Sequence, residues 1–228
     1  IIWLDVDMMY GIEYDEFPAR IAEVAMWLID HQMNMVISNE FAEYFVRLPL
    51  KKSATIIHGD ALDEDWEQII AKDKLKFIIG NPPFIGSKIM KQNQRDQIVQ
   101  QFDNADGCGV LDYVTGWYIK AAKYIHHTNI KVAFVSTNSI VQGEQTSILW
   151  GQMLNKYGIK IHFAHRTFKW SNEAKGNAAV YCVIVGFANY DTNNKSIFEY
   201  EDIKGEAHEI KAKNINPYLV DAKDVLIT

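Results

Sequence analysis

The stretch Phe77-Ile78-Ile79-Gly80-Asn81-Pro82-Pro83-Phe84 decides the fold and the site that this chain is expected to form. Its first four residues are an apolar run of the length and composition of a buried strand. The two prolines after Asn81 lack backbone N–H groups and hold the chain extended. We therefore expect the Asn81 side-chain amide and the Pro82 carbonyl to point outward as two fixed acceptors. The stretch predicts a strand that ends at a ligand site.

Two oxygen acceptors beside an aromatic ring suit a planar amino group. An exocyclic NH2 placed between the oxygens of Asn81 and Pro82 would donate both of its hydrogens and gain lone-pair density on its nitrogen. The ring of Phe84 can lie against the plane that carries the amino group. The pattern indicates activation of an amine without a general base. A plain surface turn after the strand is the alternative.

The tetrapeptide Asn81-Pro82-Pro83-Phe84 resembles the [DNS]-P-P-[YFW] motif of S-adenosylmethionine-dependent methyltransferases that modify exocyclic or amide nitrogens. The branch that acts on N6 of adenine in DNA is the most similar. The order of elements resembles the gamma arrangement, and the segments 81–88 and 165–170 are similar to single-chain restriction-modification enzymes of the MmeI type. This resemblance spans residues 8–186 and implies S-adenosylmethionine as cofactor. It also implies double-stranded DNA as the partner of the full-length enzyme, catalytic roles for the four motif residues, and no metal.

Predicted strands and helices alternate along the chain, which is typical of an α/β fold with an open, mostly parallel sheet. The resemblance makes this a Rossmann-like class I methyltransferase fold. We expect a loop at 85–109 because that segment is polar and rich in glutamine. Strands are expected at 8–12, 54–57, 75–79, 130–135, 159–164, 178–185 and 195–200, and helices at 18–34, 110–125 and 144–157.

Acidic residues follow the first two predicted strands, where ligands of such sheets lie. The resemblance implies that Glu13 accepts the ribose hydroxyls of the cofactor and that Asp60 accepts its adenine amino group. Tyr14 and Ala61 would be apolar walls of the same site. Either acid can instead cap the helix that follows it.

Three later positions carry further expectations. Phe168 and Trp170 precede the segment 177–186 and resemble the family element whose aromatic ring stacks on a flipped base. Phe84 would cover the other side of that base, although Phe168 and Trp170 can also be core aromatics. The family often has an acid near the cofactor where this chain has Asp112, which can also be a helix cap. Asn138, after the fourth strand, is expected to be structural.

Composition limits the class of protein. The chain has 228 residues, a formal net charge of -6 and a pI near 5.6, so tight DNA binding by this piece alone is not expected. No apolar run approaches the roughly 18 residues of a membrane helix, and there is no signal peptide; we expect a cytoplasmic, prokaryotic protein. Cys108 and Cys182 are expected to be free thiols. Two basic clusters can contact DNA or form solvated faces: Lys88, Lys91 and Arg95, and His165, Arg166 and Lys169.

One family feature is missing from this sequence. The Gly-rich loop Asp-Pro-x-x-Gly-x-Gly-x-Phe and its strand do not precede Glu13. We therefore expect a partial methyltransferase domain at 1–190, followed at 191–228 by the end of that domain or a linker toward an absent target-recognition domain. A sheet that lacks a central strand would expose an edge for self-association. Alternatives are methylation of a protein glutamine or an RNA base, or a noncatalytic methyltransferase-like recognition or assembly module.

Overall fold

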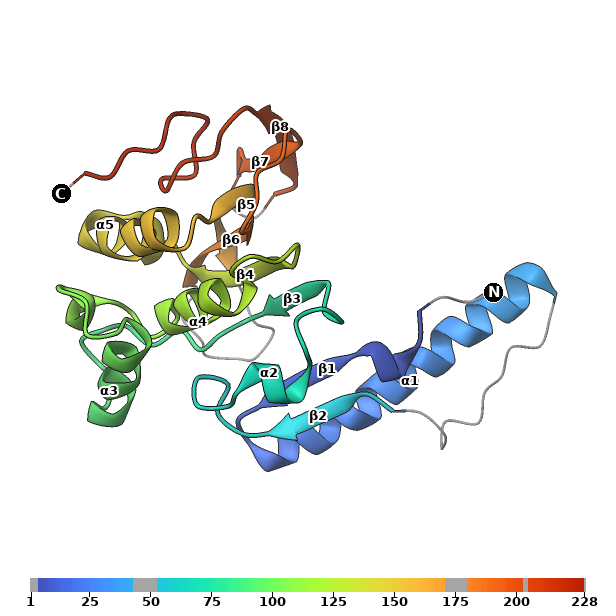
Figure 1. Cartoon of the computed structure of the whole chain (residues 1–228). Helices are drawn as coiled ribbons and strands as arrows, with labels where there is room; N and C mark the ends of the chain where they lie inside the picture. The colour runs from blue at the N-terminus through green and yellow to red at the C-terminus, as the bar shows by residue number, and fades with distance from the viewer. Residues whose placement is uncertain (1–3, 43–52, 171–179, 203–204, 228) are drawn as a thin grey trace. The chain divides into compact units, whose positions relative to one another are not determined.

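The computed structural model describes residues 4–42, 53–170, 180–202 and 205–227 of the chain. These residues form two compact units, Ile1–Ile70 and Ala71–Thr228, each with its own sheet. Figure 1 shows the order of the elements in both units. The α/β class and the open sheet are confirmed, because helices alternate with strands and neither sheet closes on itself.

The first unit is a parallel strand pair with a long helix. β1 (Tyr10–Glu13) pairs with β2 (Thr55–His58), and α1 (Glu16–Phe41) connects β1 to the segment before β2. Short helices η1 (Val6–Met8) and α2 (Trp66–Ile69) complete the unit. Pro18 lies in the first turn of α1, where a missing N–H group costs nothing.

The helix α1 extends past Asn34, where its end was expected, and this expectation was wrong. The polar residues of its last turns find partners within the helix and so do not stop it. The Asn34 amide donates to the Asp30 carboxylate at 3.0 Å, and the Ser38 hydroxyl donates to the Asn34 carbonyl at 2.7 Å. The helix ends at Phe41, and its C-cap residue Ala42 has a left-handed φ of 51°.

The second unit is built on a six-stranded sheet in the order β3-β4-β6-β5-β7-β8. Pairing is parallel for β3 with β4 and for β5 with β7, whereas β6 and β8 run antiparallel to their neighbours. The strand that leads into the Asn-Pro-Pro-Phe motif thus lies in a parallel pair. The strands are β3 (Phe77–Gly80), β4 (Lys131–Thr137), β5 (Lys160–Trp170), β6 (Val180–Ala188), β7 (Lys195–Tyr200) and β8 (Ala207–Ala212).

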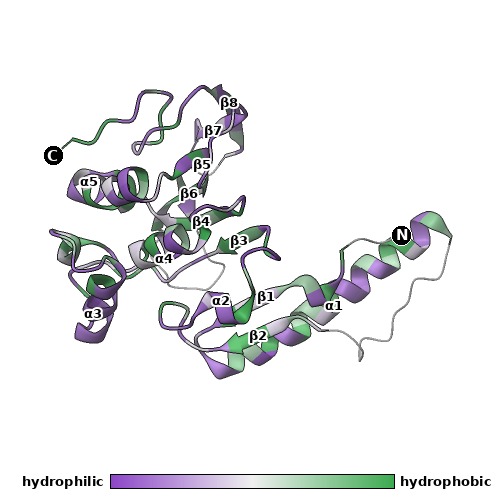
Figure 2. Ribbon diagram, in the orientation of Figure 1, coloured by the Kyte–Doolittle hydropathy of each residue, from purple (hydrophilic) through white to green (hydrophobic). Residues whose placement is uncertain are grey.

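The core of the second unit lies between the sheet and α4 (Thr115–Ile125). Tyr118 is fully buried at its centre, with its ring stacked on Phe187 at a centroid distance of 5.5 Å and edge-on to Phe134 at 5.4 Å. Helix α5 (Gly143–Gly151) continues into the π-helical turn η4 (Gln152–Lys156) and buries Trp150. Figure 2 shows apolar residues, in green, along β3, β4 and α4. The amphipathic helix predicted at 144–157 is confirmed, and the helix predicted at 110–125 is confirmed from Thr115 onward.

The segment 85–109 contains a helix, α3 (Gln92–Gln101), where a loop was expected. Its apolar residues are few, but Ile98 and the C-cap residue Phe102 are almost fully buried. The backbone N–H of Lys91 donates to the Gln94 side chain at 2.9 Å, which closes the first turn. The helix was not predicted because its sequence is mostly polar and its buried stripe consists of these two residues. The short helices η2 (Cys108–Val110) and η3 (Asn138–Val141) lie in connections.

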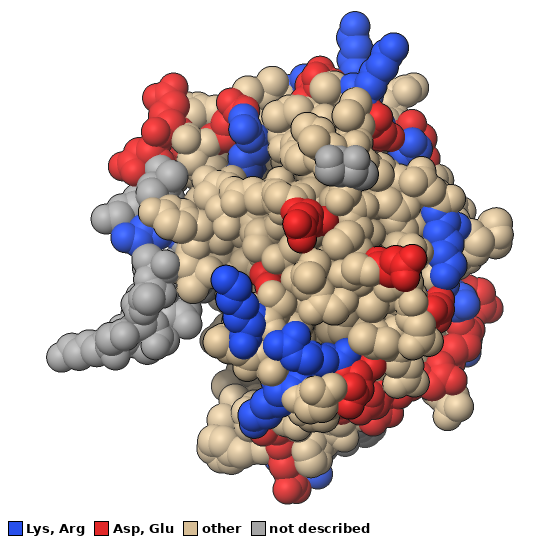
Figure 3. Space-filling view, turned by 90° about the vertical axis from the view of Figure 1, so that its left-hand side faces the viewer, with Lys and Arg blue, Asp and Glu red and all other residues tan. Residues whose placement is uncertain are grey.

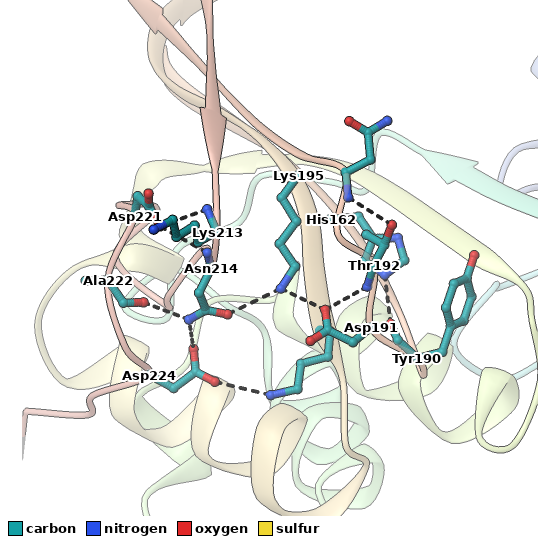
Figure 4. A network of polar contacts seen from close by, with 12 residues as sticks. His162, Tyr190, Asp191, Thr192, Lys195, Lys213, Asn214, Asp221, Ala222 and Asp224 are labelled. Atoms are coloured by element: carbon teal, nitrogen blue, oxygen red, sulfur yellow. Dashed lines mark hydrogen bonds and ion pairs between the residues drawn. The ribbon is translucent and has the colours of Figure 1, made fainter.

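The sheet continues beyond residue 190, the expected end of the domain. Strand β7 has the predicted bounds, whereas β8 was missed because most of its side chains are exposed. Buried Lys195 donates its ammonium group to Asp191 at 2.7 Å and to the Asn214 side chain at 3.4 Å (Figure 4). Asn214 in turn bonds Asp224 at 2.9 Å. This network holds the last described segment to β7, and a linker toward a further domain stays a prediction.

Cys108 and Cys182 are buried free thiols, as expected, and burial raises the pKa of Cys182 to about 11. In the ranges that the structure describes, no helix combines the length and hydropathy that crossing a membrane requires. Those ranges also contain no group of three or more His, Cys, Asp or Glu residues arranged to hold a metal ion.

Candidate functional site

The Asn-Pro-Pro-Phe motif leaves the sheet at the carboxyl end of β3. Gly80 pairs with Phe134 in the parallel ladder, and Asn81 follows it directly. Pro82 is buried, whereas Asn81 and Pro83 are exposed and Phe84 is half-buried. The Asn81 side chain makes no hydrogen bond to any other residue that the structure describes. Asn81 is exposed, and both the acceptor role of its amide toward a ligand and the outward direction of the Pro82 carbonyl stay predictions.

The segment after the motif is held by backbone and side-chain hydrogen bonds from the start of α4. The Tyr113 N–H donates to the Ile85 carbonyl at 2.9 Å, and the Ser87 N–H donates to the Asp112 carboxylate at 2.8 Å. The N-cap of α4 is Val114, so Asp112 does not occupy the cap position. Asn138 begins η3 immediately after β4, and its structural role stays a prediction.

Glu13 and Asp60 lie at neighbouring strand ends within the first unit. Glu13 pairs with His58, and the Gly59 N–H donates to the Glu13 carbonyl at 2.9 Å. The Glu13 carboxylate accepts the Tyr14 N–H at 2.9 Å, and the Asp60 carboxylate accepts the Leu62 N–H at 2.9 Å. Two acids beyond adjacent parallel strands can accept hydrogen bonds from hydroxyls and an amino group.

The capping alternative fails for Glu13 but stays open for Asp60, whose carboxylate accepts the Leu62 N–H while its carbonyl accepts the N–H groups of Asp63 and Glu64. Asp15 is the N-cap residue of α1, and Asp65 is the N-cap residue of α2, with its side chain accepting the Glu67 N–H at 3.0 Å. Asp60 instead closes the turn that follows β2. Tyr14 is 68% exposed, and half-buried Ala61 accepts the Trp66 indole N–H at 2.9 Å. Their role as walls of a cofactor site stays a prediction.

Phe168 lies in an aromatic cluster on β5 and β7. Its ring is 5.4 Å from that of Tyr200, whose hydroxyl is 2.8 Å from Nδ1 of His165. His165 stacks on Phe198 at a centroid distance of 4.3 Å and an interplanar angle of 7°. Trp170 is the last residue of β5 and pairs with Val180. The Trp170 side chain and the whole of Asn177 lie outside the described part of the chain.

The structure brings the predicted site residues together in two groups. Glu13, Tyr14, Asp60 and Ala61 lie in the first unit. The four motif residues lie in the second unit, where Asp112 is tied to the segment that follows them. Phe168 also belongs to the second unit, on β5.

Several of the basic residues that could contact nucleic acid have partners within the protein. Arg95 donates to the carbonyl of Ser87, and Arg166 pairs with Glu199. Burial lowers the pKa of His165, which keeps its ring neutral at pH 7. On the face shown in Figure 3, Lys and Arg side chains are interspersed with Asp and Glu. Lys88 and Lys91 are exposed and remain candidates for phosphate contact.

Comparison with known proteins places this site in context. The family model described as the MmeI DNA-methyltransferase domain matches residues 2–199. "DNA methyltransferase A" of Bacillus subtilis (strain 168) is 40% identical over 228 residues, which covers 98% of this chain and 25% of that protein. The structure of the Type IIL restriction-modification enzyme MmeI in complex with DNA has a TM-score of 0.93 and 54% identity, covering 99% of this chain and 30% of that one.

A more distant structure supports the fold alone. The modification subunit of a putative type I restriction enzyme from Vibrio vulnificus YJ016 has a TM-score of 0.52 at 13% identity over 83% of this chain and 34% of that chain. This chain spans only 25% to 30% of the length of the two more similar proteins. The family model nevertheless matches residues 2–199, which is most of this chain. The chain therefore belongs to the family of MmeI-type DNA-methyltransferase domains.

Proposed function

We propose that this domain transfers a methyl group from S-adenosylmethionine to N6 of a flipped adenine in double-stranded DNA, as part of a restriction-modification enzyme in the prokaryotic cytoplasm. The observation that carries the proposal is the exposed Asn81 amide at the carboxyl end of β3, within an Asn-Pro-Pro-Phe sequence. Membership of the DNA-methyltransferase family supports it. So does the DNA complex of the 54% identical MmeI.

Two carboxylates of the first unit can accept hydrogen bonds from donor groups of the cofactor. Glu13 and Asp60 lie at adjacent ends of a parallel pair, and a carboxylate has two oxygens that can accept hydrogen bonds from hydroxyl and amino groups. Glu13 would accept the ribose hydroxyls and Asp60 the adenine amino group, with Tyr14 and Ala61 beside them. When bound, S-adenosylmethionine supplies an activated methyl group.

The second unit would hold the target base. Asn81 Oδ1 and the Pro82 carbonyl would accept the two N6 hydrogens, which increases the lone-pair density on the nitrogen. Pro83 keeps the segment extended, and Phe84 would lie on one face of the base. Phe168 or Trp170 would cover the other face, because a base taken out of the stack needs two apolar walls. Orientation of this kind can lower a barrier by roughly 7 to 11 kcal/mol.

The test is Asn81→Ala in the complete natural protein that contains this chain. Methyl transfer to duplex DNA should fall on the order of 100-fold, since one fixed acceptor of the reacting amine is lost. Asn93→Ala, on the exposed side of α3, is the control and should retain the wild-type rate. A rate within about twofold of wild type for Asn81→Ala would overturn the assignment. A protein that transfers no methyl group at all would favour the noncatalytic alternative.

A further inference from the structure

We propose that Asp112 is a positioning residue that holds the segment after Asn81-Pro82-Pro83-Phe84 in place by joining it to the end of β4. The inference deepens the proposed function and rests on it. Asp112 would not touch the reacting atoms or the cofactor. It would act through Ser87, three residues beyond Phe84, and so fix the direction in which the motif presents its acceptors.

Both oxygens of the Asp112 carboxylate are used. One accepts the Ser87 N–H at 2.8 Å, and the other accepts the Ser139 hydroxyl at 2.6 Å. Ser139 lies in η3, directly after β4, and its hydroxyl is also 2.8 Å from that of Thr137. A single carboxylate thus links two segments that leave the neighbouring parallel strands β3 and β4.

Asp112 is itself fixed by its own backbone. Its N–H donates to the Gln145 side chain of α5 at 3.0 Å. Its carbonyl accepts both the N–H of buried Thr115 at 3.0 Å and the Thr115 hydroxyl at 2.7 Å. The carboxylate is therefore a rigid reference point that is anchored in the first turn of α4 and in α5.

The segment after Phe84 is held by two more hydrogen bonds. The Ile85 carbonyl accepts the Tyr113 N–H at 2.9 Å, and the Ser87 carbonyl accepts the guanidinium of Arg95. Both backbone groups of Ser87 are thus satisfied, one by Asp112 and one by Arg95. Backbone groups held on both sides leave Ser87 little freedom to rotate, and the bond to the Ile85 carbonyl holds the residue that directly follows Phe84.

The chemistry explains why this residue is an acid. A carboxylate presents two acceptor oxygens, and both face donors here, whereas an asparagine would present one acceptor and one donor amide. Bonds to an ionised acceptor are stronger than neutral ones. Replacement by asparagine should keep the bond to Ser87 and lose or reverse the bond to Ser139. Replacement by alanine should lose both.

The experiment compares Asp112→Ala and Asp112→Asn with the control Asp96→Ala in the complete natural protein. Asp96 is an exposed acid of α3, and its described bond is to Gln92 of the same helix at 2.9 Å. The kcat for methyl transfer, the KM for S-adenosylmethionine and hydrogen exchange of the Ser87 amide are measured. For Asp112→Ala we expect kcat to fall on the order of 10- to 100-fold, because small displacements of an aligned group cost about that much. KM for S-adenosylmethionine should stay within about twofold and Ser87 should exchange at least about tenfold faster. Asp112→Asn should lie between Asp112→Ala and wild type.

Ser139→Ala is a second variant for the case that Asp112→Ala does not fold. It removes one of the two bonds and leaves the Ser87 bond, so it should reduce kcat less than Asp112→Ala does. An unchanged kcat in folded Asp112→Ala, with the wild type active, would overturn the positioning role and leave the proposed function standing. A loss that appears in KM for S-adenosylmethionine instead of kcat would also overturn it, since Asp112 would then act at the cofactor. A wild-type protein without methyl transfer would overturn the proposed function itself.

Discussion

Gly80, the last residue of β3, packs so closely on Phe134 that a Cβ at Gly80 would lie 3.1 Å from ring atom Cε1. Phe134 is almost fully buried, with Tyr118 and Phe187 against its ring. The Phe134 ring is packed against two other rings and would have to shift by a few tenths of an ångström to admit a Cβ at position 80. Glycine directly before Asn81 avoids this shift.

Gly80→Ala should destabilise the second unit and disturb the motif. Overpacking a filled core costs typically about 1–3 kcal/mol, so we expect a loss of that size in the free energy of unfolding. Urea unfolding followed by near-UV circular dichroism measures it. Gly109→Ala is the matched control, because a Cβ at Gly109 would meet no atom within 4 Å. If the two variants were equally stable, the Phe134 ring would be able to move aside, which would contradict the prediction.

The buried pair of Tyr118 and Ser136 gives a second stability prediction. Their hydroxyls lie 2.7 Å apart, and both residues are fully buried. Tyr118→Phe would leave the Ser136 hydroxyl without its partner, at a cost of about 1–3 kcal/mol in the free energy of unfolding. Adding Ser136→Ala removes the unpaired hydroxyl. The double variant should therefore lose less free energy of unfolding than the two single variants lose together. Strict additivity would mean that the hydroxyls are not coupled.

Asp103 predicts a pH dependence of stability. Hydrogen bonds from Lys123 and Lys156, at 2.7 and 2.9 Å, lower the pKa of the Asp103 carboxyl in the folded protein. The unfolded chain binds this proton more readily, so the contribution is present above the unfolded pKa near 3.8 and is lost as the pH falls through the folded value.

Asp103→Asn is the variant that isolates this effect. Asparagine also accepts the left-handed φ of 54° that Asp103 has, so the backbone is not strained. The side chain is 52% exposed, and the difference from wild type should therefore be small at pH 7 and disappear as the pH falls through the folded pKa. Urea midpoints at a series of pH values measure it, and a difference that grows toward low pH would contradict the assignment.

The outer edge of β3 leads us to propose self-association of the chain. Among the residues that the structure describes, β3 pairs only with β4, and its side chains Phe77 and Ile79 are 66% and 83% exposed. An exposed apolar edge is a template for pairing with another strand. Sedimentation velocity of the chain should show concentration-dependent association, which Ile79→Lys should reduce and Lys74→Ala should not. A monomer at all concentrations would contradict the proposal.

The positions of the candidate site residues at strand ends could be predicted because the signals are local. The apolar run 77–80 followed by two prolines specifies a strand end, and Glu13 and Asp60 also follow predicted strands. The expectation that 77–80 is a buried strand was wrong, since Phe77 and Ile79 are 66% and 83% exposed. The missed elements lack such signals. Helix α3 buries only Ile98 and the adjoining Phe102, and β8 is largely exposed, so neither shows a clear apolar periodicity.

The role of Asp112 could not be read from the sequence for a different reason. Its carboxylate meets Ser87 and Ser139, which are 25 and 27 residues away along the chain. No spacing rule joins these three residues, since only the parallel pairing of β3 with β4 brings them together. Tertiary contacts of this kind become visible only in the folded chain.

Methyl transfer to N6 of adenine is tested by identifying the methylated nucleoside. The complete natural protein would be incubated with duplex DNA and S-adenosylmethionine carrying a labelled methyl group, and the DNA would be digested to nucleosides for mass spectrometry. We expect the label to appear in N6-methyldeoxyadenosine and to be lost with Asn81→Ala. Label in a cytosine nucleoside, or in no nucleoside from a protein shown to bind S-adenosylmethionine, would contradict it.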